Sequence, residues 1–147
     1  MEETNFISIK EQVIEAFKQE FSFVVDKFEL IDLLSNNSPM EIKTIENLKL
    51  PSADNNIVWH PGVYIFIGNN KLYKVGVSMR NSRERVMQHL KVWTNEGGNC
   101  IWDINKFADK SIFLFNIKKK VDRHWLLALE VFIENKYEPL IKAKRIG

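Results

Sequence analysis

Two short runs of β-branched and aromatic residues, at 62–68 and 72–77, constrain the fold most strongly. Only Asn69, Asn70 and Lys71 separate them, and a short polar connection between two such runs predicts a β-hairpin. The chain must therefore contain at least one antiparallel pair of strands.

The register of this hairpin decides which side chains share a face. With a connection of odd length we expect Tyr64 to lie opposite Lys74, whereas an even connection would put them on different faces. We expect the odd register, because otherwise the Lys74 ammonium would project into an apolar layer, and an unpaired buried charge is costly. The polar face would then also hold Phe66, Leu72 and Gly76, and the apolar layer Val63, Ile65, Ile67, Tyr73, Val75 and Val77.

A long apolar stripe precedes the hairpin. Apolar residues recur every three or four positions, which predicts a helix over residues 5–35, with room for one break. The stripe consists of Phe6, Ile9, Val13, Phe17, Phe21, Val24, Phe28, Ile31 and Leu34. Ser38, Pro39 and Glu41 could begin a short second helix, and residues 50–60 are typical of a connector.

Three further elements are predicted after the hairpin. Asn81 and Glu84 suit a capping box at the start of a helix over residues 82–93, and residues 112–117 form a third strand. Asp122 could cap a last, mostly buried helix that ends near Lys136. The expected fold is α+β: a small three-stranded antiparallel sheet flanked by helices. Residues 1–60 would be a helical N-terminal extension and linker, and residues 61–147 the main domain.

Composition limits the setting and the partners. A single cysteine, Cys100, cannot form an internal disulfide, and no apolar run approaches the roughly 20 residues that a bilayer requires. We therefore expect a cytoplasmic protein with no membrane partner. Residues 1–60 hold 5 Lys or Arg against 11 Asp or Glu, whereas residues 61–147 hold 16 against 8. Such asymmetry can mark nucleic-acid binding by the basic part, although many solvated domains carry a similar excess.

Few residues combine an unusual position with useful chemistry. Glu130 lies at the edge of an apolar helix face, and Lys74 interrupts an apolar strand, so each needs a partner. Arg85 and His89 are one helical turn apart, where both could reach one anion. Taken singly, each has an ordinary explanation: a paired or solvated charge, or, for Tyr64, a core ring with one hydrogen bond.

In this order the residues resemble the GIY-YIG nuclease superfamily. Gly62-Val63-Tyr64 stands where the family has its first element, and Lys74-Val75-Gly76 where it has the second, with Lys in place of the second Tyr. Arg85 and His89 fit the family's helix, and Glu130 looks like its metal-binding Glu. No Asn follows Pro139, where many members have one. The resemblance covers residues 61–140 and implies a GIY-YIG-like fold.

The resemblance implies a metal-dependent endonuclease that hydrolyses DNA. Tyr64 would be the general base or align the attacking water, and Lys74 could assist or replace it. Arg85 would stabilise charge on the phosphate, His89 would orient that group, and Glu130 would hold one Mg²⁺ or Mn²⁺. Several basic residues could contact the DNA backbone. These are Arg80, Arg83, Lys118, Lys119, Lys120 and Arg123.

Two other functions fit the same residues. One is a nucleic-acid-binding module that keeps the fold without cleaving. The other is a protein-interaction domain in which the acidic N-terminal helix docks a partner. That helix could also mediate a homodimer, which would bring together two sites that each nick one strand.

Overall fold

The computed structural model describes residues 8–34, 60–86 and 110–139, whose sheet is built from four strands, one more than expected. The order across the sheet is β1-β4-β2-β3, and every neighbouring pair is antiparallel. The α+β class is confirmed, and the expectation of three strands was wrong. The elements are α1 (Ile9–Glu20), η1 (Val25–Lys27), β1 (Phe28–Leu34), β2 (Gly62–Gly68), β3 (Lys71–Ser78), β4 (Lys110–Ile117), η4 (Lys120–Asp122) and α4 (His124–Tyr137).

The additional strand is β1, where the apolar stripe had predicted a helix. The helix α1 ends at Glu20, and the chain turns and returns as an edge strand paired with β4. Within β1, Ile31 and Leu33 are buried while Leu30 and Asp32 are exposed, which is strand alternation. Apolar residues at 28, 31 and 34 suit either a helix or a strand with the irregularity seen between Asp32 and Leu34. Because residues 28–34 pair with β4, they form a strand and not a helix.

The hairpin of β2 and β3 reaches the expected faces by another route. Its connection is a two-residue turn, in which Asn69 and Asn70 both have positive φ, 51° and 59°. Asn tolerates this conformation, and two such residues give the turn that matches strand twist. A two-residue turn has even length, but the register shifts by one residue between Phe66 and Ile67, so that Tyr73 is bulged. Because of the bulge, Tyr64 and Lys74 lie on the same face of the hairpin, as the expected register required.

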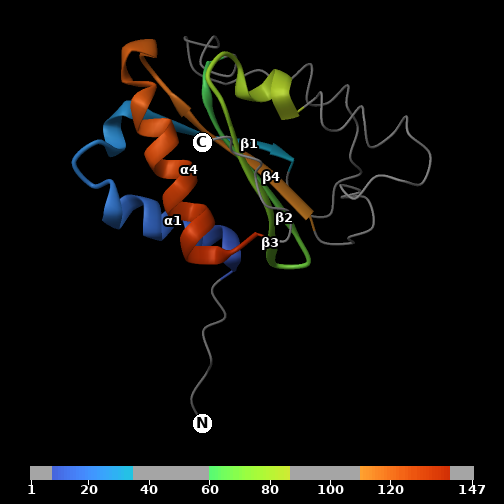
Figure 1. The fold of residues 1–147 in the computed structure, drawn as a ribbon. Helices are drawn as coiled ribbons and strands as arrows, with labels where there is room; N and C mark the ends of the chain where they lie inside the picture. The colour runs from blue at the N-terminus through green and yellow to red at the C-terminus, as the bar shows by residue number, and fades with distance from the viewer. Residues whose placement is uncertain (1–7, 35–59, 87–109, 140–147) are drawn as a thin grey trace.

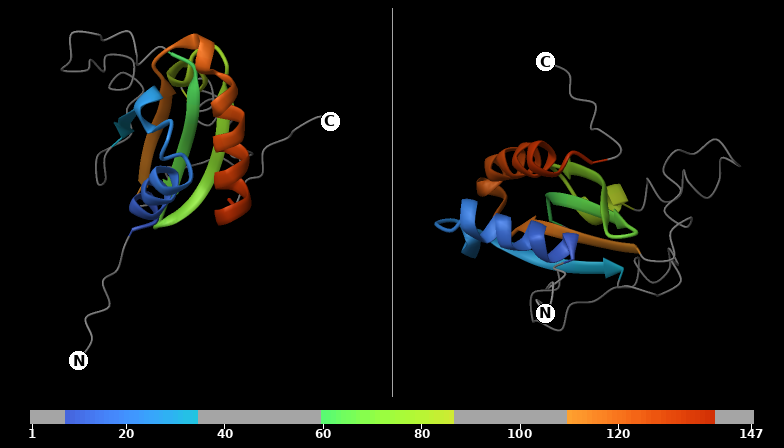
Figure 2. Two further views of the ribbon diagram at one scale, coloured as in Figure 1. Left: turned by 90° about the vertical axis from the view of Figure 1, so that its left-hand side faces the viewer. Right: turned by 90° about the horizontal axis from the view of Figure 1, so that it is seen from below.

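Two helices cover one face of the sheet. Buried residues of α1 and α4 join alternate residues of β2 and β4 in one core cluster. In Figure 1, α1 and α4 lie to the left of the sheet and the helix that starts at Ser82 lies to its right; Figure 2 gives two further views of this arrangement. The strand members of the core are Phe28, Val63, Ile65, Ile67, Leu72, Val75, Phe113, Phe115 and Ile117. The apolar residues of α1 are thus buried in the core of this same chain.

Two of the predicted helix starts can be checked in the described residues. The Asn81 side chain accepts a hydrogen bond from the Glu84 amide at 3.0 Å, which confirms Asn81 as a cap. Asp122 does not cap α4. The N-cap residue of that helix is Arg123, and no side chain caps it by a hydrogen bond. The Asp122 carboxylate lies 3.4 Å from Lys27 Nζ instead, because η4 turns it toward η1. No helix among residues 8–34, 60–86 and 110–139 could cross a bilayer.

Some expectations lie outside the described residues. These are the short helix begun by Ser38, Pro39 and Glu41, most of the connector at 50–60, and the part of the helix after residue 86. The domain boundary at residue 60 stays a prediction. Within the described residues, however, β1 shares a sheet with β4 and α1 shares the core of β2.

Candidate active site

The site is built on the face of the hairpin opposite the core cluster. Tyr64 pairs with Gly76, and Phe66 pairs with Lys74, so all four residues share this face. Tyr64 and Lys74 are therefore on one side of the sheet, as expected, but two residues apart instead of directly opposite. Leu72 pairs with Ile67 and belongs to the core cluster, because the bulge at Tyr73 shifts it to the other face. Tyr64 and Lys74 are only 4% and 6% exposed.

Gly76 makes room for the Tyr64 ring. A Cβ added at Gly76 would overlap the end of that ring, at Cζ and Oη. Any side chain at this position would therefore push the phenol away. The glycine of the second sequence element thus has a physical role, because it lets the tyrosine of the first lie across the neighbouring strand.

Arg85 reaches Tyr64 from the helix that starts at Ser82. A hydrogen bond from the guanidinium to the phenol and the positive charge of Arg85 both act on Tyr64. Arg85 is otherwise exposed, so one end of its side chain contacts the phenol while the residue stays open to solvent. This arrangement leaves a guanidinium available to an anion at the edge of the site.

A buried polar network fixes the start of that helix, and sequence reasoning missed it. The Ser82 hydroxyl donates to Asn116 Oδ1 on β4, and the Ser82 amide donates to the His60 carbonyl at 3.1 Å. His60 Nδ1 lies 2.9 Å from the Ile117 carbonyl. Ser82 and Asn116 are both fully buried. The network ties the helix that carries Arg85 to β4 and to the segment just before β2. Two separate sequence features could have indicated it: a polar residue within the apolar 112–117 run, and a Ser after the Asn81 cap.

Gly62 belongs to the same region. It pairs with Asn116 across the sheet, and a Cβ there would overlap the Asn116 side chain and approach the Phe115 carbonyl at 2.8 Å. Only glycine leaves space for Asn116 to reach Ser82. Both glycines of the two sequence elements are thus required by close approach, not by backbone conformation.

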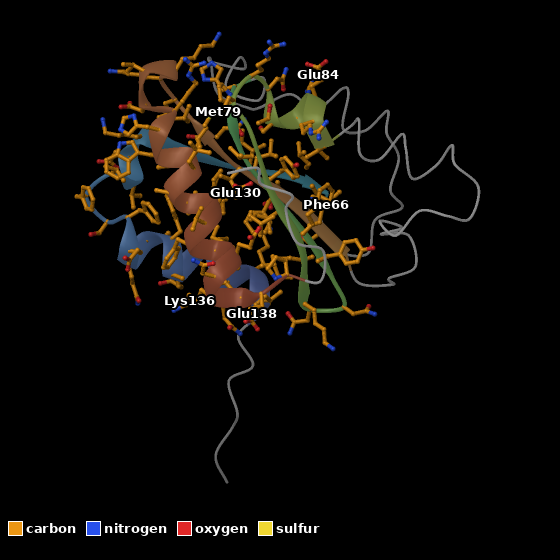
Figure 3. The ribbon with its side chains drawn as sticks, viewed as in Figure 1. Phe66, Met79, Glu84, Glu130, Lys136 and Glu138 are labelled. Atoms are coloured by element: carbon orange, nitrogen blue, oxygen red, sulfur yellow. The ribbon has the colours of Figure 1, made fainter. Side chains whose placement is uncertain are left out.

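Glu130 lies on α4, which covers the core face and packs mainly against β3, the edge strand next to the site. It is 3% exposed, and its charge acts on both Tyr64 and Lys74. Figure 3 shows it between α4 and the sheet, whereas Lys136 and Glu138 lie at the far end of the helix. Glu134, one turn after Glu130, also acts on Lys74 and was not predicted. Its position four residues from Glu130 was the available signal.

Burial shifts the proton affinities of the two strand residues in opposite ways. Burial raises the pKa of the Tyr64 phenol, although the charge and hydrogen bond of Arg85 partly oppose this. Burial lowers the pKa of Lys74 from 10.5 to about 8, against the effect of Glu130 and Glu134. In both cases removal from water disfavours the charged form. Lys74 is therefore the group whose charge changes nearer to neutral pH.

The carboxylates fit a hard divalent cation with few protein ligands. No cluster of three or more His, Cys, Asp or Glu is found among the residues that the structure describes. Mg²⁺ usually takes one or two carboxylates and fills its other positions with water and phosphate oxygens. Glu130, with Glu134 one turn away, is compatible with that pattern.

The remaining predicted site residues are mostly exposed basic side chains. His89 lies outside the described residues. Arg80, Lys118, Lys119, Lys120 and Arg123 are exposed. Because β3 and β4 are both antiparallel to β2, these five residues follow the strands at the same end of the sheet. Arg83 is 1% exposed, so its guanidinium is not available to a DNA backbone at the surface. We do not retain it among the candidate contacts.

Comparison of the chain with family models, with curated proteins and with solved structures finds no match. The resemblance to GIY-YIG nucleases therefore stays a prediction from the sequence residues.

Proposed function

We propose that the protein is a metal-dependent endonuclease that hydrolyses DNA at a single GIY-YIG-like site. The observation that carries the proposal is the gathering of Tyr64, Lys74, Arg85 and Glu130, which come from two strands and two helices. Structural roles alone do not require one site to collect a phenol, an ammonium, a guanidinium and a carboxylate. Their chemistry fits cleavage of a phosphodiester.

Each residue has a role that its surroundings support. Arg85, exposed and held at the phenol, stabilises the charge that develops on the phosphate. Tyr64 aligns the attacking water through its hydroxyl, since a raised pKa makes it a poor base. Lys74, with a pKa of about 8, is the better proton acceptor of the two. Glu130 is the residue that would hold one Mg²⁺ or Mn²⁺; such an ion supplies Lewis-acid stabilisation when bound.

The test is nicking of supercoiled plasmid by the full chain with Mg²⁺ or Mn²⁺. Glu130→Gln and Arg85→Ala should each lower the rate by about a hundredfold or more. Arg85→Lys should retain part of the activity, since it keeps the charge and loses the paired donors. Glu15→Gln, on the exposed face of α1, is the matched carboxylate control and should cleave normally.

Two outcomes would contradict the proposal. Cleavage that persists in both Glu130→Gln and Arg85→Ala would place the chemistry elsewhere. DNA binding without cleavage under any divalent metal would identify a binding module on the same fold.

A further inference from the structure

Three rings gather at the surface where α1 gives way to η1 and where α4 begins. Phe23 lies in the turn after α1 and is 73% exposed. Its ring meets Trp125 edge-on, with centroids 5.5 Å apart, and His124 lies 5.2 Å from Trp125 on the same helix. We call Phe23, His124 and Trp125 the aromatic cluster.

The aromatic cluster is open to solvent on its outer side. Phe21, 6% exposed, contacts Trp125 from the core side and closes the cluster below. The Phe23 side chain, by contrast, is mostly exposed to solvent. Val121, on the adjoining η4, is 80% exposed. A single exposed apolar residue is ordinary, but several that adjoin one another mark a surface that meets a partner.

Positive charge borders the cluster. Lys118, Lys119, Lys120 and Arg123 are all exposed and lie just before His124. The Lys118 amide donates to the Lys27 carbonyl at 2.8 Å, and Lys27 pairs with Asp122, so η1 and η4 are held side by side. With Asp26 as the other carboxylate of these two turns, five cations stand against two anions. The border is therefore cationic.

The border and the candidate active site lie at the same end of the sheet. Lys118 directly follows Ile117, whose neighbour Asn116 pairs with Gly62. Tyr64 is two residues into β2 from that pair, roughly 7 Å along the strand. The aromatic cluster packs on the core side of the sheet and the site lies on the other side, so a nucleic acid held at Tyr64 and Arg85 would reach the cluster by passing this end of the sheet, where the cationic border stands.

We propose that the aromatic cluster binds an unpaired segment of the DNA substrate, with bases stacked on Phe23 and Trp125 and phosphates contacted by the cationic border. Exposed rings next to cations suit single-stranded nucleic acid, because every base has a face that stacks and every nucleotide a charge. This inference rests on the proposed function, and it specifies the substrate as duplex DNA with a single-stranded tail or branch.

The test compares binding of three labelled DNAs to the full chain in metal-free buffer, where cleavage is prevented. The probes are a blunt duplex, the same duplex with a tail of about ten thymidines, and the tail alone. The natural chain should bind the tailed duplex more tightly than the blunt one. Phe23→Ser should weaken binding of the tailed duplex roughly tenfold and leave the blunt duplex unchanged. Leu30→Ser, which removes another exposed apolar side chain on β1, should change neither.

Three results would overturn the inference. One is equal binding of blunt and tailed duplexes by the natural chain, and another is an unchanged affinity of Phe23→Ser for the tail. A third is tighter binding of an RNA strand or an acidic peptide than of the DNA tail. Plasmid nicking by Phe23→Ser separates this inference from the proposed function. If Phe23→Ser still nicks plasmid in a reaction that requires Glu130 but the natural chain shows no preference for tailed DNA, only this inference fails.

Discussion

The two faces of the sheet are both buried but differ in what fills them. On the core face, Ile65, Phe113 and Phe115 are fully buried and meet apolar residues of α1 and α4. On the opposite face, Tyr64 and Lys74 are as deeply placed, yet they interact with Arg85 and Glu130. The first face needs only close packing, whereas the second needs a specific partner for each polar group.

This difference separates stability from function. Apolar packing is spread over many weak contacts, so a loss on the core face should lower the free energy of unfolding without changing the site. A change on the polar face should disturb a few directed interactions and therefore the reaction.

Phe115→Ala should produce the largest loss of stability. The ring is fully buried and contacts Phe17 of α1, with centroids 4.8 Å apart. Its removal leaves a cavity between the helix and the sheet and should lower the free energy of unfolding by about 4 kcal/mol. Urea unfolding followed by circular dichroism measures this. Folded molecules should still nick DNA at a near-normal rate, and a parallel loss of rate would mean that the two faces are coupled.

Gly76→Ala should instead act on the site. The added methyl group would displace the Tyr64 ring from Arg85, and a misplacement of about 1 Å in an active site can cost a hundredfold in rate. The nicking rate, measured below the melting temperature, should fall by that order.

Val75→Ala is the matched control for Gly76→Ala. Val75 is the neighbouring residue, fully buried on the core face. Its truncation should lower the melting temperature and spare the rate. If Val75→Ala reduced cleavage as strongly as Gly76→Ala, the polar face would have no special role.

The sequence predicted the polar face better than the number of strands. Tyr64 and Lys74 were assigned to one face because a buried ammonium in an apolar layer is costly, and that argument depends on chemistry within a few residues. The bulge that produces this register could not be predicted, since the Asn69–Asn70 turn and the requirement of Lys74 conflict until Tyr73 is bulged.

The N-terminal strand shows why the rest was missed. Residues 28–34 have an apolar spacing that suits two structures, and only pairing with β4, more than seventy residues later, selects one. The link between Ser82 and Asn116 also joins residues far apart in sequence, 34 positions from one another. The spacing of apolar residues reports only on local periodicity. It therefore cannot predict the contacts across the sheet that support a site.

The smallest expected effect concerns Lys74 and pH in the metal-free protein. Its pKa is lowered from 10.5 to about 8 in the folded protein, so the unfolded chain binds more protons between these values. The free energy of unfolding should therefore rise with pH in this window, by about 1 to 2 kcal/mol between roughly pH 8 and pH 9.5. Above that range the raised pKa of Tyr64 acts in the opposite direction. Urea unfolding at several pH values measures the rise, and Lys74→Met should abolish it. If the free energy of unfolding rose equally with pH in the natural chain and in Lys74→Met, burial of the Lys74 ammonium would cost little. The polar face would then not differ from the core face in the cost of burying its side chains.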